Sequence, residues 1–458
     1  MPKMPPRWRE LLQIAWPLII ANSFWNLQLT IDRIFLGQLS TESLGAAMSV
    51  MGVFWVPMAL LQQTVSYVGT FVAQYFGADK SRNIGACVWQ SLYISVVGGL
   101  GFLCLNLLSE DFFTWVGHSS EVRRLEIEYF DSVAFSALPT AVVAAVSGFF
   151  MGLGHTRKII VINCVGLVLN IVLDYVMIFG KWGFPAMGVA GAGYATAIAT
   201  YGSALFGIYL ITRPENERRF GMRGDWKPDL AIIKSFIRYG VPSGLQWSLE
   251  GLAFTVFLIV MGSAKQGDVA LASSSIALTL MMLSVLPSMG VAQAVMTVVG
   301  QSLGAKSPER AQESTWVGVQ ISLIYMATVA LSLALVPDLY LSWFRNDQNP
   351  ELWAAVRDLS VSLLRIVAIF TLFDSVYLNI SFALKAAGDT RFVSLIALAV
   401  PWPVMVLPAY LCRHLDRAAE IAWGFGAIYA MLTAFILFLR FRSGRWKSIN
   451  LLESLNRG

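Results

Sequence analysis

Apolar runs of membrane-spanning length recur along the chain, separated by short segments rich in charge, Gly, Pro or Asn. A helix needs roughly 20 apolar residues to cross the hydrocarbon core of a bilayer. By that measure the pattern predicts twelve helical spans, near 11–38, 44–76, 86–108, 127–152, 158–180, 188–212, 231–262, 269–303, 310–336, 355–386, 392–412 and 420–440. The spans use nearly the whole chain, so we expect an all-α integral membrane protein without a soluble domain.

Composition and charge placement support this interpretation. Of the 458 residues, 56% are hydrophobic and only 13% charged, whereas about a quarter are charged in soluble domains. The first apolar run is too long for a signal peptide and lacks a small-residue cleavage site. With the N-terminus inside, most Lys and Arg residues fall in inner loops, which predicts cytoplasmic termini and a multi-pass protein of the cell inner (cytoplasmic) membrane. This bias also accounts for the net charge of +5, so no nucleic-acid partner is expected.

The chain contains an internal repeat. The segment "VAQYFGADKSRNIGACVWQ" (72–90) resembles "VGQSLGAKSPERAQESTWVG" (299–318), and "GHTRK" (154–158) resembles "GDTRF" (388–392). The pairs that share one offset of 227 are Gln74 and Gln301, Gly77 and Gly304, Ala78 and Ala305, and Trp89 and Trp316. We therefore predict two six-helix lobes made by duplication, with an N-lobe over 1–212, a cytoplasmic linker over 213–230, a C-lobe over 231–440 and a cytoplasmic tail over 441–458. Parallel repeats of this kind build many secondary transporters.

Four acidic residues interrupt the predicted spans: Asp32, Asp174, Glu250 and Asp374. An ionisable side chain at membrane depth is costly and is usually functional. The repeat does not account for them, because each aligns with a non-acidic residue in the other lobe; Asp174, for example, aligns with Pro408. Each lobe is therefore expected to carry its own chemistry.

The N-lobe acids belong to a polar set. Asn170 and Asp174 are four residues apart and share one helix face, as do Gln28 and Asp32. Together with Thr196, they predict an oxygen-rich pocket built from three helices. Such a pocket suits a hard monovalent cation. It equally suits a shared proton, because two nearby carboxylates in a low dielectric cannot both ionise cheaply. A simple pair between Asp32 and Arg33 is not expected, since adjacent helical residues do not face each other.

Aromatic and methionine side chains in the spans indicate an adaptable apolar substrate cleft. We assign Trp25, Gln28, Asn163 and Met177 to this cleft. The interior carries more acids than bases, which favours positively charged substrates. The expected partners are small-molecule organic cations and membrane lipids, and we expect a monomer.

Catalytic motifs are absent from the sequence: it contains no HExxH, no GxSxG and no Walker A lysine loop. We therefore expect no enzyme activity and no cofactor other than a proton or sodium ion that drives transport. The cysteines (Cys87, Cys104, Cys164 and Cys412) have no CxxC spacing, so neither a disulfide framework nor a metal site is predicted beyond sodium at the coupling site.

The sequence resembles the multidrug and toxic compound extrusion (MATE) transporters over essentially its whole length. The resemblance rests on "WPLIIANSFWNLQLTIDRIFLGQLSTESLGAA" (16–47), the two inner loops with "GA", the "GHTRK" and "GDTR" loops, and "GVAGAGYATAIA" (188–199). It implies a two-lobe antiporter working by alternating access, in which a proton or sodium ion enters as a drug-like, usually cationic molecule leaves.

The resemblance also implies roles for individual residues. Asp32, Asn170, Asp174 and Thr196 match the N-lobe cation site of the archaeal and DNA-damage-inducible type. Glu250 and Asp374 match the C-lobe acids of the sodium-coupled bacterial type. Because both sets are present, the coupling ion and the driving lobe stay open. The alternative is a lipid-linked glycan flippase of the same superfamily, although those tend to line the cleft with basic residues.

Overall fold

The computed structural model describes residues 5–222, 224, 226–345 and 349–456. Within these ranges the regular structure is entirely helical, and no strand occurs. The all-α prediction is therefore confirmed.

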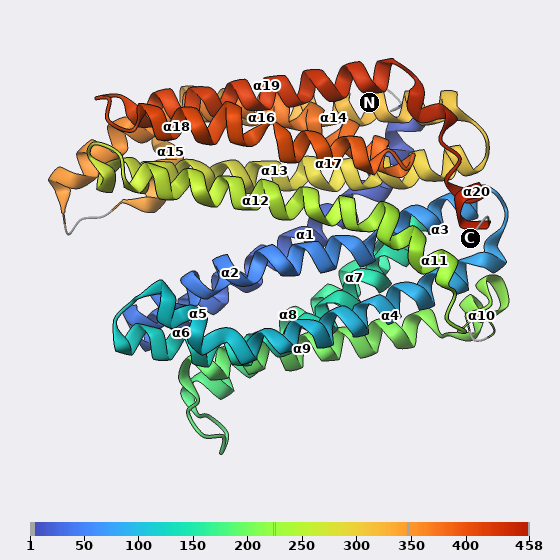
Figure 1. The fold of residues 1–458 in the computed structure, drawn as a ribbon, viewed down its shortest axis with the longest axis horizontal. Helices are drawn as coiled ribbons and strands as arrows, with labels where there is room; N and C mark the ends of the chain where they lie inside the picture. The colour runs from blue at the N-terminus through green and yellow to red at the C-terminus, as the bar shows by residue number, and fades with distance from the viewer. Residues whose placement is uncertain (1–4, 223, 225, 346–348, 457–458) are drawn as a thin grey trace. The chain divides into compact units, whose positions relative to one another are not determined.

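The helices follow the predicted spans in order (Figure 1). Those of the first half are α1 (Pro6–Leu39), α2 (Thr41–Ser66), α3 (Val68–Gly77), α4 (Ile84–Leu103), α5 (Ser109–Val116), α6 (Ser120–Val133), α7 (Ala137–Gly152), α8 (Arg157–Phe179), α9 (Gly188–Ile211), α10 (Pro214–Phe220) and α11 (Leu230–Ser235). Those of the second half are α12 (Val241–Gly262), α13 (Gly267–Gly304), α14 (Pro308–Leu335), α15 (Pro337–Leu341), α16 (Pro350–Ala386), α17 (Thr390–Ala399), α18 (Leu407–Cys412), α19 (Ala418–Arg442) and α20 (Leu451–Asn456).

Eleven helical runs in the described part of the chain are long and apolar enough to cross a membrane. They match the second to twelfth predicted spans; the run Thr41–Gly77, for example, joins α2 and α3 over the predicted span 44–76. The first predicted span lies on α1, which has 34 residues but is not among the eleven. Polar side chains, including Asp32 and Arg33, lower its mean hydropathy, although its length suffices to span a bilayer.

The chain divides into two compact units. The N-terminal unit comprises Trp16–Ser248, Gly300–Ser307 and Asn450–Gly458. The C-terminal unit comprises Met1–Ala15, Leu249–Val299 and Pro308–Ile449. The lobe boundaries predicted from the repeat stay a prediction.

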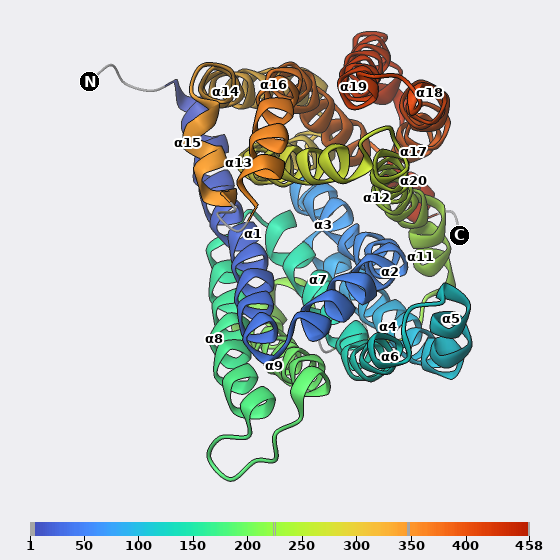
Figure 2. The ribbon, with the colours of Figure 1, turned by 90° about the vertical axis from the view of Figure 1, so that its left-hand side faces the viewer.

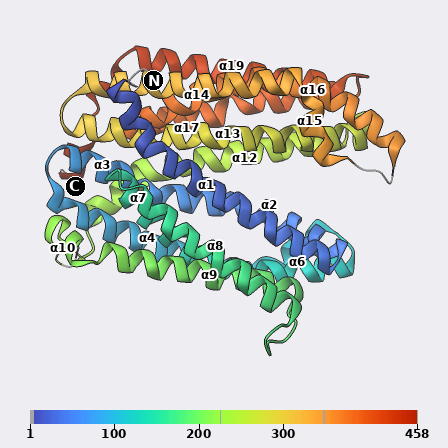
Figure 3. The ribbon, with the colours of Figure 1, turned by 180° about the vertical axis from the view of Figure 1, so that it is seen from behind.

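In the N-terminal unit, small residues let helices approach closely. Helix α7 packs against α2, α3, α4 and α9, and α8 runs beside α9 (Figures 1 and 3). A Cβ at Gly148 of α7 would lie 2.8 Å from the carbonyl oxygen of Ser66, and one at Gly191 of α9 would lie 2.7 Å from that of Met177. Small residues at such contacts let helices pack closely, and this van der Waals packing is one of the forces that associate helices in lipid, where apolar burial between helices is worth little.

The C-terminal unit packs around large aromatic side chains. Helix α16 lies against both α14 and α19 (Figure 2). Trp423 of α19 is 2% exposed, meets Phe257 edge to face at 5.5 Å, and donates its indole N–H to Ser274 Oγ at 2.9 Å. This hydrogen bond satisfies the one polar atom of a buried indole.

A bidentate ion pair joins two helices of the C-terminal unit. Arg440 of α19 donates from Nε to Asp389 Oδ2 at 2.7 Å and from Nη2 to Oδ1 at 3.2 Å. Its guanidinium also lies 4.7 Å from the ring centroid of Phe392. The side chains of Arg440 and Asp389 are only 20% and 8% exposed. The repeat does not supply a second such pair, because Asp389 aligns with His155.

The backbone shows that the sequence repeat is structural. Asp79 and Lys306, which are 227 residues apart, both have φ of 56° although neither is glycine. Gly154 and Gly388 of the "GHTRK" and "GDTRF" loops have φ of 75° and 93°. Positive φ is uncommon for residues other than glycine. Its recurrence at matching positions therefore indicates one loop conformation used twice.

The repeated glycines bring the two copies of the motif into contact. An added Cβ at Gly77 of α3 would collide with the backbone of Gln301, and one at Gly304 of α13 would collide with the backbone of Gln74. All four residues belong to the N-terminal unit. The two motifs therefore pack reciprocally, because each glycine lies in close contact with the backbone of the glutamine in the other copy.

We predict that Gly304→Ala lowers the free energy of unfolding by about 1–3 kcal/mol, the usual effect of overpacking. Its Cβ would lie 2.9 Å from the carbonyl carbon of Gln74 and 3.0 Å from the amide nitrogen of Ala78, both backbone atoms that cannot move aside cheaply. Thermal unfolding in detergent measures the effect. The control is Gly424→Ala in α19, whose Cβ would meet nothing within 4 Å. Equal melting temperatures for the two variants would refute the tight contact.

Candidate functional site

The predicted N-lobe polar residues come together from three helices. Helix α1 carries Asp32, α8 carries Asn170 and Asp174, and α9 carries Thr196. Asp32 is 6% exposed, while Asn170 and Asp174 are fully buried. Asn170 donates from Nδ2 to Thr196 Oγ1 at 3.3 Å, and the carboxyl groups of Asp32 and Asp174 lie close enough to interact directly. The structure thus assembles these four residues in one place within the N-terminal unit.

Most of the oxygens in this cluster lack donors. Asp32 Oδ1, Asn170 Oδ1 and both carboxylate oxygens of Asp174 are buried and accept no hydrogen bond of normal geometry from the described residues. A buried acceptor without a donor loses its hydration without compensation, at roughly 1–3 kcal/mol or more for a charged group. A proton shared by the carboxyls, or a cation bound by their oxygens, would relieve this. The donor set therefore fits a monovalent coupling ion.

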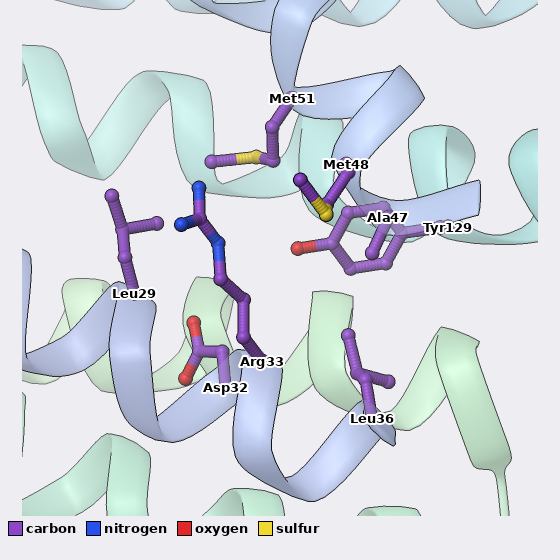
Figure 4. A pocket seen from close by; sticks show the side chains of 8 residues that line it. All are labelled: Leu29, Asp32, Arg33, Leu36, Ala47, Met48, Met51 and Tyr129. Carbon is purple, nitrogen blue, oxygen red and sulfur yellow. The ribbon is translucent and has the colours of Figure 1, made fainter. Parts of the chain in front are cut away.

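A small pocket of about 20 Å³ adjoins Asp32 (Figure 4). Such a volume admits a water-sized group. It is lined by residues of α1, α2 and α6, namely Leu29, Asp32, Arg33, Leu36, Ala47, Met48, Met51 and Tyr129. Figure 4 shows the guanidinium of Arg33 and the hydroxyl of Tyr129 both pointing into the space beside the methionines. The pocket therefore combines one acid, one base and one phenol with apolar walls.

Arg33 was considered from the sequence as a neighbour of Asp32 and as one of two arginines within the predicted spans, whereas Tyr129 was not singled out. The charge of Arg33 acts on Asp32 without an ion pair between them in the part of the chain that the structure describes. Tyr129 stands in the predicted span 127–152 among ordinary aromatic and acidic residues. Its sequence context carries no signal, because its role depends on how α6 packs against α2.

The four residues assigned to a substrate cleft lie elsewhere in the N-terminal unit. Trp25 packs against Trp55 with ring centroids 6.2 Å apart. Asn163 donates from Nδ2 to the carbonyl oxygen of Ala21 at 3.3 Å, Gln28 is half-buried on α1, and Met177 is 6% exposed. None of them lines the pocket of Figure 4. Their role in substrate binding stays a prediction.

The C-lobe acids also meet, within the C-terminal unit. Glu250 of α12 and Asp374 of α16 are half-buried and interact electrostatically. The hydroxyl of Tyr377, one turn after Asp374, donates to Glu250 Oε1. The structure therefore forms the second acidic set with a phenol as an additional member.

Lys385 is a charged residue of this region that the sequence interpretation overlooked. It is 1% exposed near the end of α16, its Nζ lies 4.1 Å from the ring centroid of Phe382, and its charge acts on Glu250. The signal was visible, since a lysine interrupts the apolar run "SFALKAAG" (381–388). The C-lobe acids thus have a basic residue near them, Lys385, as Asp32 has Arg33.

The chain is similar to known proteins over almost its full length. It is 25% identical over 451 residues to the probable multidrug resistance protein NorM of Thermotoga maritima, covering 97% of this chain and 94% of that protein. It is 28% identical over 399 residues to the multidrug resistance protein PmpM of Pseudomonas aeruginosa, covering 86% and 82%.

Solved structures share the fold. A MOP superfamily transporter from Pyrococcus furiosus superposes with a TM-score of 0.88 at 22% identity, over 96% of this chain and 97% of that one. A MATE structure described as being in the bent conformation gives 0.85 at 22% identity, over 99% and 100%. Both similarities establish the two-lobe, twelve-helix architecture.

The family model MatE matches the chain twice, over residues 17–176 and 242–411. The two matches begin at Pro17 and Pro242, one in each predicted lobe, which agrees with the internal repeat. Since they cover well over half of the 458 residues, the chain belongs to the MatE family of multi-pass membrane transporters that its motifs indicated.

Proposed function

We propose that this protein is a secondary active antiporter that exports cationic or amphipathic drug-like compounds in exchange for protons or sodium ions, by alternating access. Family membership supports secondary transport, and the names of the relatives in Thermotoga maritima and Pseudomonas aeruginosa support export of drugs. The coupling ion and the antiport are inferred from the chemistry of the described residues. No cofactor besides the coupling ion enters the proposal.

One observation carries the coupling proposal, namely the buried carboxyl pair whose oxygens lack donors. Asp32 and Asp174 each carry at least one such oxygen, and Asn170 adds an amide oxygen. Carboxylate and amide oxygens are the ligands of hard cations. A carboxyl group that takes a proton becomes a donor and satisfies an oxygen of its neighbour. Both ions are therefore compatible with the cluster.

The exchange follows from competition for the same negative charge. When the pair releases its proton or sodium ion, the uncompensated carboxylates attract a cationic substrate. When the ion returns, it neutralises the pair and removes that attraction, so the substrate leaves. An ion that binds one conformation more tightly than the other also shifts the population between them. Asp32 and Asp174 hold the ion in this scheme, and Asn170 and Thr196 orient them.

Transport by the purified protein in lipid vesicles tests this function. Ethidium, a permanent cation, serves as the probe, with a proton or a sodium gradient imposed in turn. We expect at least one gradient to drive ethidium against its concentration difference, and an ionophore that collapses that gradient to stop it. If the rate of ethidium transport were the same with and without either gradient, antiport would be rejected.

We also propose a monomer in the cell inner (cytoplasmic) membrane with both termini cytoplasmic, on the basis of the Lys and Arg distribution. In a variant without Cys87, Cys104, Cys164 and Cys412, single cysteines at Glu215 and at Glu351 should react with an impermeant thiol reagent from opposite sides of the membrane. Both side chains are exposed, so access is not limited by packing. Labelling of both from one side would contradict the predicted orientation of the two lobes.

A further inference from the structure

Lys385 is a buried lysine that the coupling scheme does not use. Its side chain is 1% exposed, although α16 ends at the next residue, Ala386. A buried ammonium is costly unless a negative charge or the face of an aromatic ring compensates it. In the alignment that pairs "GHTRK" with "GDTRF", Lys385 matches Met151. Packing of the repeated unit therefore does not require a lysine at this position.

The direction of the Lys385 side chain is unusual for its place in the helix. A lysine near the end of a span normally extends outward, which puts its ammonium in water. In Lys385, however, Nζ lies 4.1 Å from the ring centroid of Phe382, three residues earlier on α16. The side chain therefore folds back along the helix, away from its end and toward the C-lobe acids.

Those acids share a face of α16 with the lysine. Asp374 and Lys385 are eleven residues apart, about three turns of helix, so their side chains leave the same side. Tyr377, one turn after Asp374, donates its hydroxyl to Glu250 of α12. The charge of Glu250 acts on Lys385 and also on Asp374. Lys385 thus compensates the charge of Glu250 within the C-terminal unit.

A bound cation and this ammonium would compete for the same negative charge. Glu250 and Asp374 offer carboxylate oxygens, the ligands that hard cations use. Asp389, the next acid along the chain, is already engaged, because Arg440 donates to both of its oxygens. A cation that enters beside Glu250 is repelled by the ammonium of Lys385. When that cation leaves, the ammonium remains and keeps Glu250 compensated.

We propose that Lys385 is a tethered cation that competes with monovalent cations for Glu250 and thereby weakens their binding to the C-lobe acids. Lys385 acts through Glu250 and does not itself hold the ion. Weakened binding allows an ion to leave the site as well as to enter it. This inference goes beyond the proposed function, which assigns the coupling ion to Asp32 and Asp174.

Binding of radioactive sodium to the purified protein tests the proposal, separately from transport. It is measured at alkaline pH, where protons compete least, for the wild type, Lys385→Met and Lys385→Arg. Each protein is compared with its own Glu250→Gln version, so that sodium bound elsewhere in the chain cancels. Lys265→Met is the control, because Lys265 lies in the same unit with its side chain 60% exposed and paired with Asp416.

We expect Lys385→Met to tighten the Glu250-dependent binding of sodium by at least about tenfold, the effect of removing one unit charge within roughly 10 Å at an effective dielectric constant of about 20. Lys385→Arg keeps the positive charge and should stay close to the wild type. Lys265→Met should leave sodium affinity unchanged. Methionine should be tolerated, because it is apolar and occupies the matching position of the first repeat.

Two results would overturn the proposal. One is an equal Glu250-dependent affinity in the wild type and Lys385→Met, including no such binding in either. The other is an equal gain in Lys385→Arg, which would trace the gain to loosened packing. A merely structural lysine would lower the melting temperature of Lys385→Met without tightening sodium binding. If Lys385→Met fails to insert, the same comparison is made with Lys385→Gln, which also removes the charge.

Discussion

Asp174→Asn is expected to insert and fold normally while losing gradient-driven transport by roughly 100-fold, the upper end of usual coupling between two ligands. Asparagine keeps the shape of the side chain but cannot take up or release a proton. Both oxygens of the Asp174 carboxylate lack donors, so an amide at this position can donate to Asp32 and should not weaken the fold. Thermal stability is therefore expected to be equal or higher.

Expression, melting temperature and vesicle transport of ethidium measure the effect together. Asp32→Asn should behave like Asp174→Asn, and the double variant should be little worse than either, because two groups that act as one site are not additive. A salt-bridged structural aspartate would instead leave a buried partner unpaired and destabilise the protein by several kcal/mol. Normal transport by well-folded Asp174→Asn protein would reject the coupling role.

The C-lobe acids provide the contrast. Glu250→Gln and Asp374→Asn should alter the sodium response or the range of compounds more than they abolish transport. Glu250 has a hydroxyl donor in Tyr377 and a buried cation, Lys385, acting on it, so its charge is already compensated inside the C-terminal unit. If these two variants lost transport while Asp174→Asn kept it, the driving ion site would lie in the C-terminal unit.

Asp389→Asn is expected to lower the free energy of unfolding by about 3 kcal/mol, so it should affect stability as strongly as Asp174→Asn affects transport. The change leaves the guanidinium of Arg440 mostly buried without its charged partner, and breaking one side of such a pair is more costly than removing both. The double variant Asp389→Asn/Arg440→Leu should therefore melt at a higher temperature than Asp389→Asn alone. Thermal unfolding in detergent measures all three proteins.

An exposed pair of the same geometry is the control. Arg357 donates to both carboxylate oxygens of Asp338, each at 2.8 Å, but the two side chains are 43% and 61% exposed. Exposed pairs contribute at most about 1 kcal/mol, so Asp338→Asn should change the melting temperature little. If Asp389→Asn lowered the melting temperature no more than Asp338→Asn does, the Arg440–Asp389 pair would contribute no more to stability than an exposed pair.

The spans and the repeat were predictable because both are local properties of the chain. Each apolar run must be long enough to cross the bilayer, and its length and ends are visible in the sequence. The duplication is visible in pairs such as Gly77 and Gly304, and the shared φ of 56° at Asp79 and Lys306 confirms it in the backbone. The carboxylates of the spans stood out for a similar reason, since a buried acid in an apolar run is costly wherever its helix packs.

The partners of these carboxylates depend on how the helices rotate and pack against one another. A local sequence pattern does not contain that information. Spacing put Asn170 and Asp174 on one face of α8, but packing decided that this face meets Asp32 and Thr196. The same holds for Arg33, whose direction into the pocket depends on α2 and α6, and for Lys385, whose charge matters because Glu250 of another helix lies near it. Sequence distance says nothing of these contacts, because the helix faces that meet come from segments tens to hundreds of residues apart.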